Sequence, residues 1–158
     1  MTARLPTLSL LLASYALLFS SLCRAEIPSA ATETLDNLHH HAASADWDKY
    51  FDLYTKDAHF IGTDASENWT MTEFAEYARP TKGWRYTLVS RSLQQHGDVI
   101  VFDEHLSSTS YGNCRGTGTL VLTDEGWKVL QYHLSFPIPN AMAKRITAQI
   151  KATQGKKP

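Results

Sequence analysis

Two histidines and an aspartate in the second half of the chain are the side chains with the most chemical potential. Asp103 and His105 lie two positions apart, as do His133 and Ser135, in stretches that predict β-strands. Residues two apart on a strand share one face of the sheet. A cleft raises the pKa of an aspartate, so Asp103 could act as a general base while a histidine orients the substrate or donates a proton. If the chain is an enzyme, we expect Asp103 and His133 to be its catalytic residues.

Two predicted hairpins must bring these residues together. The turn signal at Asp124-Glu125-Gly126 predicts a hairpin with Gly116 opposite His133, where the glycine leaves open space. The same alternation around the His96-Gly97 turn puts Asp103 on that face. The expected result is a conical pocket, packed at its tip and open at its mouth. Its predicted ligand-binding residues are Tyr54, Trp69, Tyr86, Asp103, His105, Gln131, His133 and Ser135.

A different strand register would change the contents of this pocket. A one-residue bulge exchanges the two faces of a strand beyond it. Glu104 and Arg115, otherwise an ion-pair candidate on the other face, would then lie in the pocket instead. The sequence leaves both arrangements open.

The order of the predicted elements indicates the fold class. Helices are expected at 29–44, 47–54 and 70–77, the last from a capping box at Thr70-Met71-Thr72-Glu73, and a short strand is expected at 58–62. Four long strands follow at 85–94, 99–106, 113–123 and 126–136, and then a helix at 140–153. This order predicts an α+β fold, a cone-shaped α+β roll in which a curved antiparallel sheet wraps around the N-terminal helices.

Three stretches resemble a known superfamily. They are Val101-Phe102-Asp103-Glu104, Arg115-Gly116-Thr117-Gly118 and the last strand with its extension, 126–140. They are similar to the SnoaL-like, or nuclear transport factor two-like, superfamily, and in particular to an exported bacterial SnoaL-like subgroup. The resemblance covers roughly residues 30–140 and implies the same conical fold. It implies no particular reaction.

The resemblance leaves more than one function open. The leading hypothesis is an exported SnoaL-like domain that binds a small, partly apolar molecule in the conical pocket, with no assigned reaction and no cofactor. The alternative is a cofactor-free isomerase, cyclase or hydratase-type enzyme with Asp103 as its general base, because ketosteroid isomerase and SnoaL-like cyclases use a pocket aspartate in this way. A third hypothesis is a purely structural dimer or accessory domain.

The histidines and cysteines do not predict a metal site. Three consecutive helical histidines, 39–41, point about 100° apart, so they cannot hold one ion together and are expected on a solvated helix face. Asp103, His105 and His133 have suitable ligand types but no spacing signature. Cys114 is expected to be a small buried hydrophobe.

The N-terminal segment predicts export. A basic start at Arg4, an uncharged apolar run and small residues up to Ala25 indicate a signal peptide at 1–25, before a SnoaL-like domain at 26–140 and a C-terminal helix with a basic tail at 141–158. We therefore expect a periplasmic or secreted protein without stable membrane association after cleavage. The chain has 15 Lys and Arg against 16 Asp and Glu, so its net charge of −1 predicts no nucleic-acid partner.

The expected partners are a small-molecule ligand and a second copy of the chain. In the predicted register Leu130, Tyr132, Leu134 and Phe136 share the outer face of the last strand. An exposed apolar stripe of this kind favours a homodimer through the outer sheet face. The C-terminal helix could cover the stripe instead.

Export can be tested directly. We expect protein recovered from its native host to begin near Glu26, because Ala25 ends the small-residue segment that a signal peptidase recognises. N-terminal sequencing measures this. Soluble cytosolic protein that retains residues 1–25 would contradict the prediction.

Overall fold

The computed structural model describes residues 27–154. The predicted signal peptide and the last residues of the basic tail lie outside the described residues. None of the described helices is both long and apolar enough to span a membrane.

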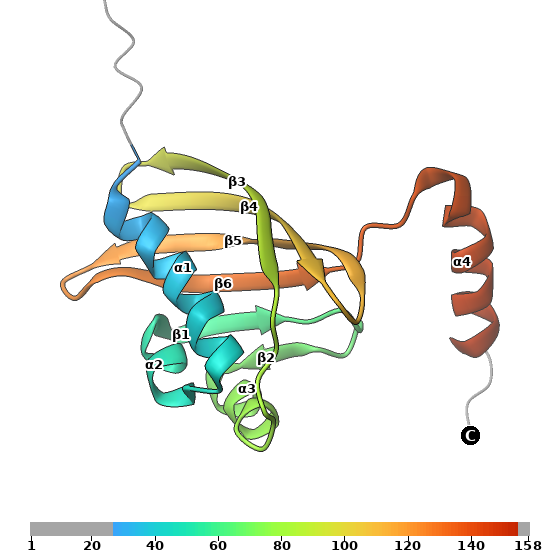
Figure 1. The fold of residues 1–158 in the computed structure, drawn as a ribbon, viewed down its shortest axis with the longest axis horizontal. Helices are drawn as coiled ribbons and strands as arrows, with labels where there is room; N and C mark the ends of the chain where they lie inside the picture. The colour runs from blue at the N-terminus through green and yellow to red at the C-terminus, as the bar shows by residue number, and fades with distance from the viewer. Residues whose placement is uncertain (1–26, 155–158) are drawn as a thin grey trace, which may run out of the picture.

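Six strands form one curved sheet in the order β2-β1-β6-β5-β4-β3. Their bounds are β1 Tyr54–Ile61, β2 Asn68–Thr70, β3 Thr87–His96, β4 Val99–Ser108, β5 Gly112–Thr123 and β6 Gly126–Ser135. Neighbours are antiparallel except β1 and β6, which run parallel. The predicted cone-shaped α+β roll is confirmed (Figure 1).

Three helices pack on the concave side of the sheet. They are α1 Ser29–Ser44, α2 Trp47–Asp52 and α3 Met71–Ala78. Helix α1 lies across the sheet (Figure 1) and buries Ala31, Leu35, Leu38 and Ala42, which recur at helical spacing. Helix α3 packs against β1 and β2.

The start of α3 has a side-chain cap, whereas the start of α2 does not. The predicted capping box of α3 is present, with Thr70 accepting from the Glu73 backbone N–H and the Glu73 carboxylate accepting from the Thr70 backbone N–H. Asp46 precedes α2, but its side chain accepts from Lys49 Nζ at 2.8 Å instead of capping the helix.

One glycine fixes the loop that follows α3. Gly83 has a φ of 83°, and a Cβ there would collide with the Ala42 carbonyl oxygen at the end of α1. The next residue, Trp84, donates its backbone N–H to the same oxygen at 3.1 Å. The close approach brings Trp84 against the end of α1.

Two elements differ from the sequence prediction. No strand was expected between residues 62 and 70. Asn68–Thr70 nevertheless forms the short strand β2, because this segment pairs antiparallel with β1. Tyr54 begins β1 and does not end the second helix, and it pairs with Val129 of β6. Both differences arise from pairing with distant strands.

A bulge in β6 exchanges the faces of its second half. Leu120 pairs with Val129, but the next pair along is Thr119 with Gln131, so Leu130 is an extra residue. Tyr132 is consequently buried at 4% exposure, while Gln131 is exposed. The bulge reverses the predicted inward and outward residues from this point to the end of the strand.

The last helix, α4 Asn140–Gln154, stands apart from the roll (Figure 1). It agrees with the helix predicted at 140–153. Residues Phe136 to Pro139 join it to β6.

Candidate ligand-binding cavity

The predicted catalytic residues lie on the outer face of the sheet. Phe102 and Glu104 are buried on the concave side of β4, so Asp103 between them faces outward and its side chain is 51% exposed. His133 also faces outward, because the neighbouring Tyr132 and Leu134 line the interior. Asp103 and His133 share a face as expected, since both are register partners of Thr117, but the predicted face was wrong.

The bulge in β6 is the physical reason for the correction at His133. It pairs Gly116 with Leu134 and not with His133, so the glycine face of β5 meets Tyr132 and Leu134. The same exchange places Gln131 and Ser135 on the outer face, away from the predicted pocket. Asp103 and His105 lie there for a different reason, because the β4–β5 register pairs Glu104, and not Asp103, with the glycine face of β5 at Gly116.

Glu104 and Arg115, the pair expected in the pocket from the alternative register, also lie on opposite faces of the sheet. Glu104 lies inside and is fully buried, whereas Arg115 lies outside and its Nε is 3.3 Å from Asp103 Oδ2. The pair expected from a bulged register, Glu104 with Arg115, therefore does not form. Arg91 of β3 takes the place of Arg115.

A cavity of about 260 Å³ lies between α1, α3 and the concave face of the sheet. Trp69 and Tyr86, two of the predicted binding residues, line it. Tyr54 lies behind it and is not among its lining residues, because the Tyr54 hydroxyl forms a 2.9 Å hydrogen bond with that of Tyr50 in the core.

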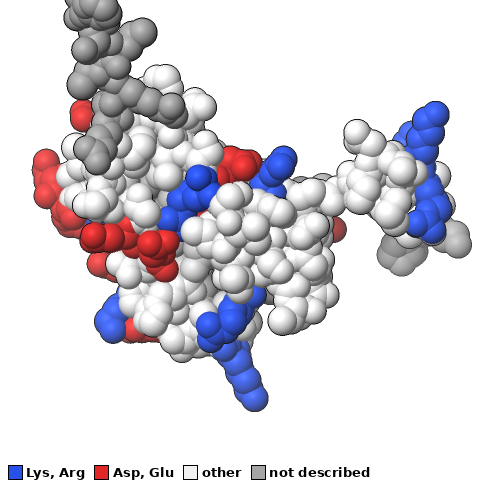
Figure 2. Space-filling model, turned by 45° about the horizontal axis from the view of Figure 1, so that its top comes forward, with Lys and Arg blue, Asp and Glu red and all other residues white. Residues whose placement is uncertain are grey.

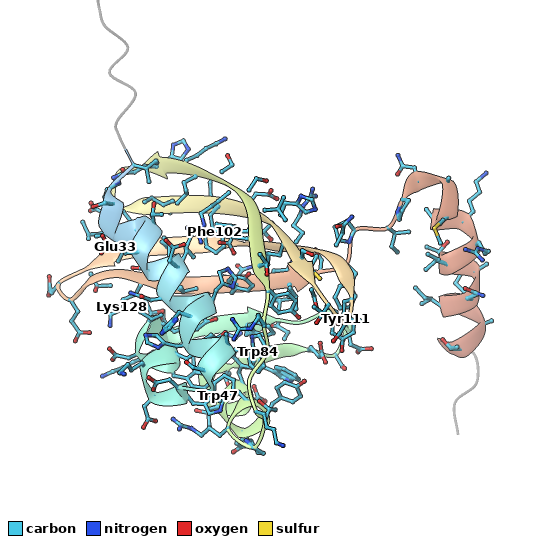
Figure 3. The ribbon with its side chains drawn as sticks, viewed as in Figure 1. Glu33, Trp47, Trp84, Phe102, Tyr111 and Lys128 are labelled. Carbon is cyan, nitrogen blue, oxygen red and sulfur yellow. The ribbon has the colours of Figure 1, made fainter. Side chains whose placement is uncertain are left out.

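Aromatic rings form most of the cavity wall. Phe60 stacks on Phe74 with centroids 3.9 Å apart, and the Tyr132 ring lies parallel to Phe60 at 6.1 Å. Figure 3 shows Trp84 beside the C-terminal end of α1 and Tyr111 at the end of the sheet nearest α4. The aromatic lining residues are Tyr50, Phe60, Trp69, Phe74, Tyr77, Trp84, Tyr86, Tyr111, Tyr132 and Phe136.

A buried carboxylate connects the cavity wall to three elements. Glu104 Oε2 lies 2.8 Å from His39 Nε2 of α1 and accepts from the Tyr132 hydroxyl at 3.1 Å. Its other oxygen accepts from Arg91 Nε at 2.7 Å. Arg91 also donates to Asp36 at 2.8 Å, which holds its guanidinium against α1. His39 and Tyr132 both line the cavity.

The environment of Glu104 keeps it ionised. Burial raises the pKa of this carboxyl group, but the hydrogen bond and charge of His39 and the charge and hydrogen bond of Arg91 outweigh it and lower the pKa below its usual value. An ionised carboxylate only accepts hydrogen bonds. His39 therefore carries its proton on Nε2 when neutral, which leaves Nδ1 unprotonated, and Nδ1 forms no hydrogen bond within the described part of the chain.

The glycines of β5 make room for this network. A Cβ at Gly116 would collide with the Tyr132 hydroxyl, and one at Gly118 would collide with the Gln131 carbonyl oxygen and lie 2.7 Å from the Phe102 ring. The space was expected opposite His133. The tyrosine that donates to Glu104 occupies it instead.

Burial also sets the protonation of two other candidate groups. It raises the pKa of the cavity-lining Tyr86 to about 12, so this phenol is a hydrogen-bond donor at neutral pH. Burial likewise raises the pKa of the Cys114 thiol, which is fully buried and is therefore a poor nucleophile.

Sequence reasoning overlooked His39. It was expected with His40 and His41 on a solvated helix face, but its side chain is only 16% exposed. The missed signal is its spacing, because His39 is four positions after Leu35 and three before Ala42, on the edge of the apolar face of α1. Within residues 27–154 no cluster of three His, Cys, Asp or Glu side chains could hold a metal ion.

The four residues expected to form an apolar stripe on the outer face of β6 do not lie together on that face. Tyr132 is buried and Leu134 packs against the core, so of its four residues only Leu130 lies on the outer sheet face and Phe136 lies at the cavity. A homodimer through the outer sheet face stays a prediction, without this argument in its support.

Comparison with known proteins establishes the family. The sequence profile of the SnoaL-like domain matches residues 31–139, so the chain belongs to the SnoaL-like domain family. No curated protein matches the chain.

Solved structures share the fold at low sequence identity. A protein from Novosphingobium aromaticivorans, whose name proposes an aromatic ring hydroxylase, has a TM-score of 0.61 and 18% identity over 72% of this chain and 94% of its own. One from Parabacteroides distasonis, whose name proposes a ketosteroid isomerase, has a TM-score of 0.59 and 15% identity over 75% and 94%. One from Streptomyces avermitilis, whose name proposes a dehydratase, has a TM-score of 0.59 and 13% identity over 70% and 96%. These likenesses define the fold.

The Glu104 network should give the protein a characteristic acid sensitivity. Because the pKa of Glu104 is lowered in the folded state, its stabilisation is present above the unfolded pKa of about 4.3 and is lost as the pH falls through the folded pKa. Glu104→Gln should remove this acid dependence. At pH 7 it should lower the free energy of unfolding by about 3–5 kcal/mol, because Arg91 loses its buried partner.

The measurement is urea unfolding at a series of pH values between about 3 and 7. The matched control is Asp103→Asn on the same strand, which removes an exposed carboxylate and should change stability by less than about 1 kcal/mol. Equal acid dependence of wild type and Glu104→Gln would contradict the assignment.

Proposed function

We propose that this SnoaL-like domain binds a small, partly apolar molecule in the cavity between α1, α3 and the sheet. The observation that carries the proposal is a cavity walled by aromatic rings, with polar groups among its lining residues that include His39, Thr63, Glu67 and the Tyr86 hydroxyl. Ligand sites typically combine apolar walls with a few convergent polar groups.

The lining residues favour a compact ligand without negative charge. A volume of about 260 Å³ is just below the range of about 300–1,000 Å³ that is typical of sites for drug-sized ligands. Among the described residues no Lys or Arg lines the cavity, and Arg91 is already paired with Glu104 and Asp36. An anionic ligand would therefore lack a cationic partner, and the stacked rings of Phe60 and Phe74 favour a flat ligand.

Acid–base catalysis at His39 is the second candidate function. Its support is the 2.8 Å contact with Glu104, which fixes the imidazole and leaves Nδ1 able to accept a proton. In this candidate the base of an isomerase or dehydratase-type reaction is His39 and not Asp103, because Asp103 faces outward. Tyr132 is the neighbouring hydroxyl on the same carboxylate.

Filling the cavity should abolish binding without unfolding the protein. We expect Leu134→Trp to prevent the retention of native ligands, because Leu134 lines the cavity and an indole would occupy its space. Gln131→Trp places the same side chain on the exposed outer face of the same strand and should leave binding unchanged.

The measurement is native mass spectrometry of ligands that co-purify with each variant, with thermal unfolding as the control for folding. Overpacking costs about 1–3 kcal/mol, so Leu134→Trp should still fold. Equal ligand retention by the two variants would contradict the proposed site.

Acid–base chemistry can be tested without knowing the reaction. If His39 is a general base, wild-type protein in D₂O should catalyse the uptake of deuterium at carbon in its co-purified ligand, as measured by mass spectrometry. His39→Gln should abolish this exchange, because an amide cannot accept the proton. His40→Gln, on the exposed neighbour, should not change it. Exchange that persists in folded His39→Gln would exclude His39 and leave binding as the function.

A further inference from the structure

Helix α4 has one apolar stripe and carries only positive charge. Met142, Ile146 and Ile150 recur every four residues, so they lie along one side of the helix. Lys144, Arg145 and Lys151 are its ionisable residues. At about 100° per residue the two lysines lie opposite the stripe and Arg145 lies to one side.

This stripe has no partner among the described residues. Met142 is 37% exposed and Ile150 is 46% exposed, and among residues 27–154 no hydrogen bond or ion pair joins α4 to the roll. Isolated helices of about 12–15 residues are marginal in water, and most helical stability in proteins comes from packing of an apolar face. A packed surface for α4 is therefore expected in the functional state.

The mouth of the cavity offers an apolar surface of matching kind. Tyr77, Tyr111 and Phe136 line the cavity and are 55%, 64% and 38% exposed, so their rings form an exposed rim around it. Tyr111 stacks on Phe136 with centroids 4.9 Å apart, which joins the β4–β5 loop to the end of β6. We call these three residues the aromatic rim.

The linker disfavours packing of α4 on its own rim. A tight turn over Phe136–Pro139 would require Ile138 to adopt either the α region or a positive φ. Pro139 disfavours the α region for the residue before it, and a β-branched residue rarely adopts a positive φ. The Phe136–Pro139 segment therefore extends away from the mouth, and α4 stands clear of the roll (Figure 1).

The charges of the roll and the helix are complementary. Residues 27–139 contain 8 Lys and Arg against 15 Asp and Glu, whereas residues 140–158 contain 5 Lys and Arg and no acidic residue. Figure 2 shows only basic side chains on α4, with the acidic side chains of the roll gathered mostly on the side away from that helix. Helix α3, which carries Tyr77 of the rim, has two glutamates and no basic residue. The charges of α4 therefore attract it to the roll of another molecule.

We propose that α4 packs through Met142, Ile146 and Ile150 on the aromatic rim of a second copy of this chain, and that the second copy returns the same contact. The exchange gives a two-fold dimer in which each cavity is closed by the helix of the partner. This interface differs from the outer sheet face and does not depend on what the cavity binds.

Disulfide trapping distinguishes exchange between chains from closure within one chain. Mixed Ile146→Cys and Tyr111→Cys chains should form a covalent dimer of the two different variants under mild oxidation. Wild type, which has only Cys23 and the buried Cys114, is the background control. A chain with both substitutions that instead closes a disulfide within itself would overturn the proposal, as would the absence of any mixed dimer.

A pair of charge substitutions tests the stripe itself. Ile146→Glu should raise the dimer dissociation constant at least about tenfold, because it buries a carboxylate against the rim. Ala148→Glu adds the same charge on the other side of α4 and should change the constant less than about threefold. Analytical ultracentrifugation of the expressed chain measures both. Equal effects of the two variants, or a wild type that is monomeric at about 100 µM, would overturn the proposal.

Discussion

The ionised Glu104 is the constraint on which the arrangement of the roll depends. A buried carboxylate is costly unless every oxygen has a partner, and its partners here come from three different elements: His39 of α1, Arg91 of β3 and Tyr132 of β6. Apolar contacts are not directional, so by themselves they specify the position of α1 on the sheet less strictly than hydrogen bonds do. The directional bonds to Glu104 fix the helix at one position, and they thereby fix the wall of the cavity.

The bulge at Leu130 allows this network to form. Without the extra residue Tyr132 would face outward and the strand end would bring His133 and Ser135 inside. One inserted residue therefore replaces a polar, wet interior with an aromatic one that surrounds a single satisfied charge. The glycines of β5 complete the exchange, since side chains at Gly116 and Gly118 would collide with Tyr132, with the β6 backbone and with Phe102.

Sequence patterns predicted the features that short segments determine. The capping box at Thr70 and the apolar spacing of α1 depend on residues within a few positions, so the helices and the long strands were found close to their true bounds. The face of each strand depends on register, and a bulge leaves no mark on composition. Asp103 and His133 were correctly expected to share one face of the sheet, but that face was expected to line the pocket and is the outer one. His39 was missed because its role depends on Glu104, which is distant in the sequence.

The parallel pairing of β1 with β6 has a consequence for the order of folding. Strand β1 lies near the start of the domain, but it joins the main part of the sheet by pairing with β6, the last strand. The six-stranded sheet therefore cannot be completed until nearly the whole chain is available. The hairpins β3–β4–β5–β6 can form from neighbouring segments, whereas the β1–β6 contact pays the entropy of closing the longest loop. Folding of this domain is therefore governed by a late, non-local step, and a chain interrupted before β6 would lack the strand that connects β1 to β5 and on which α1 packs.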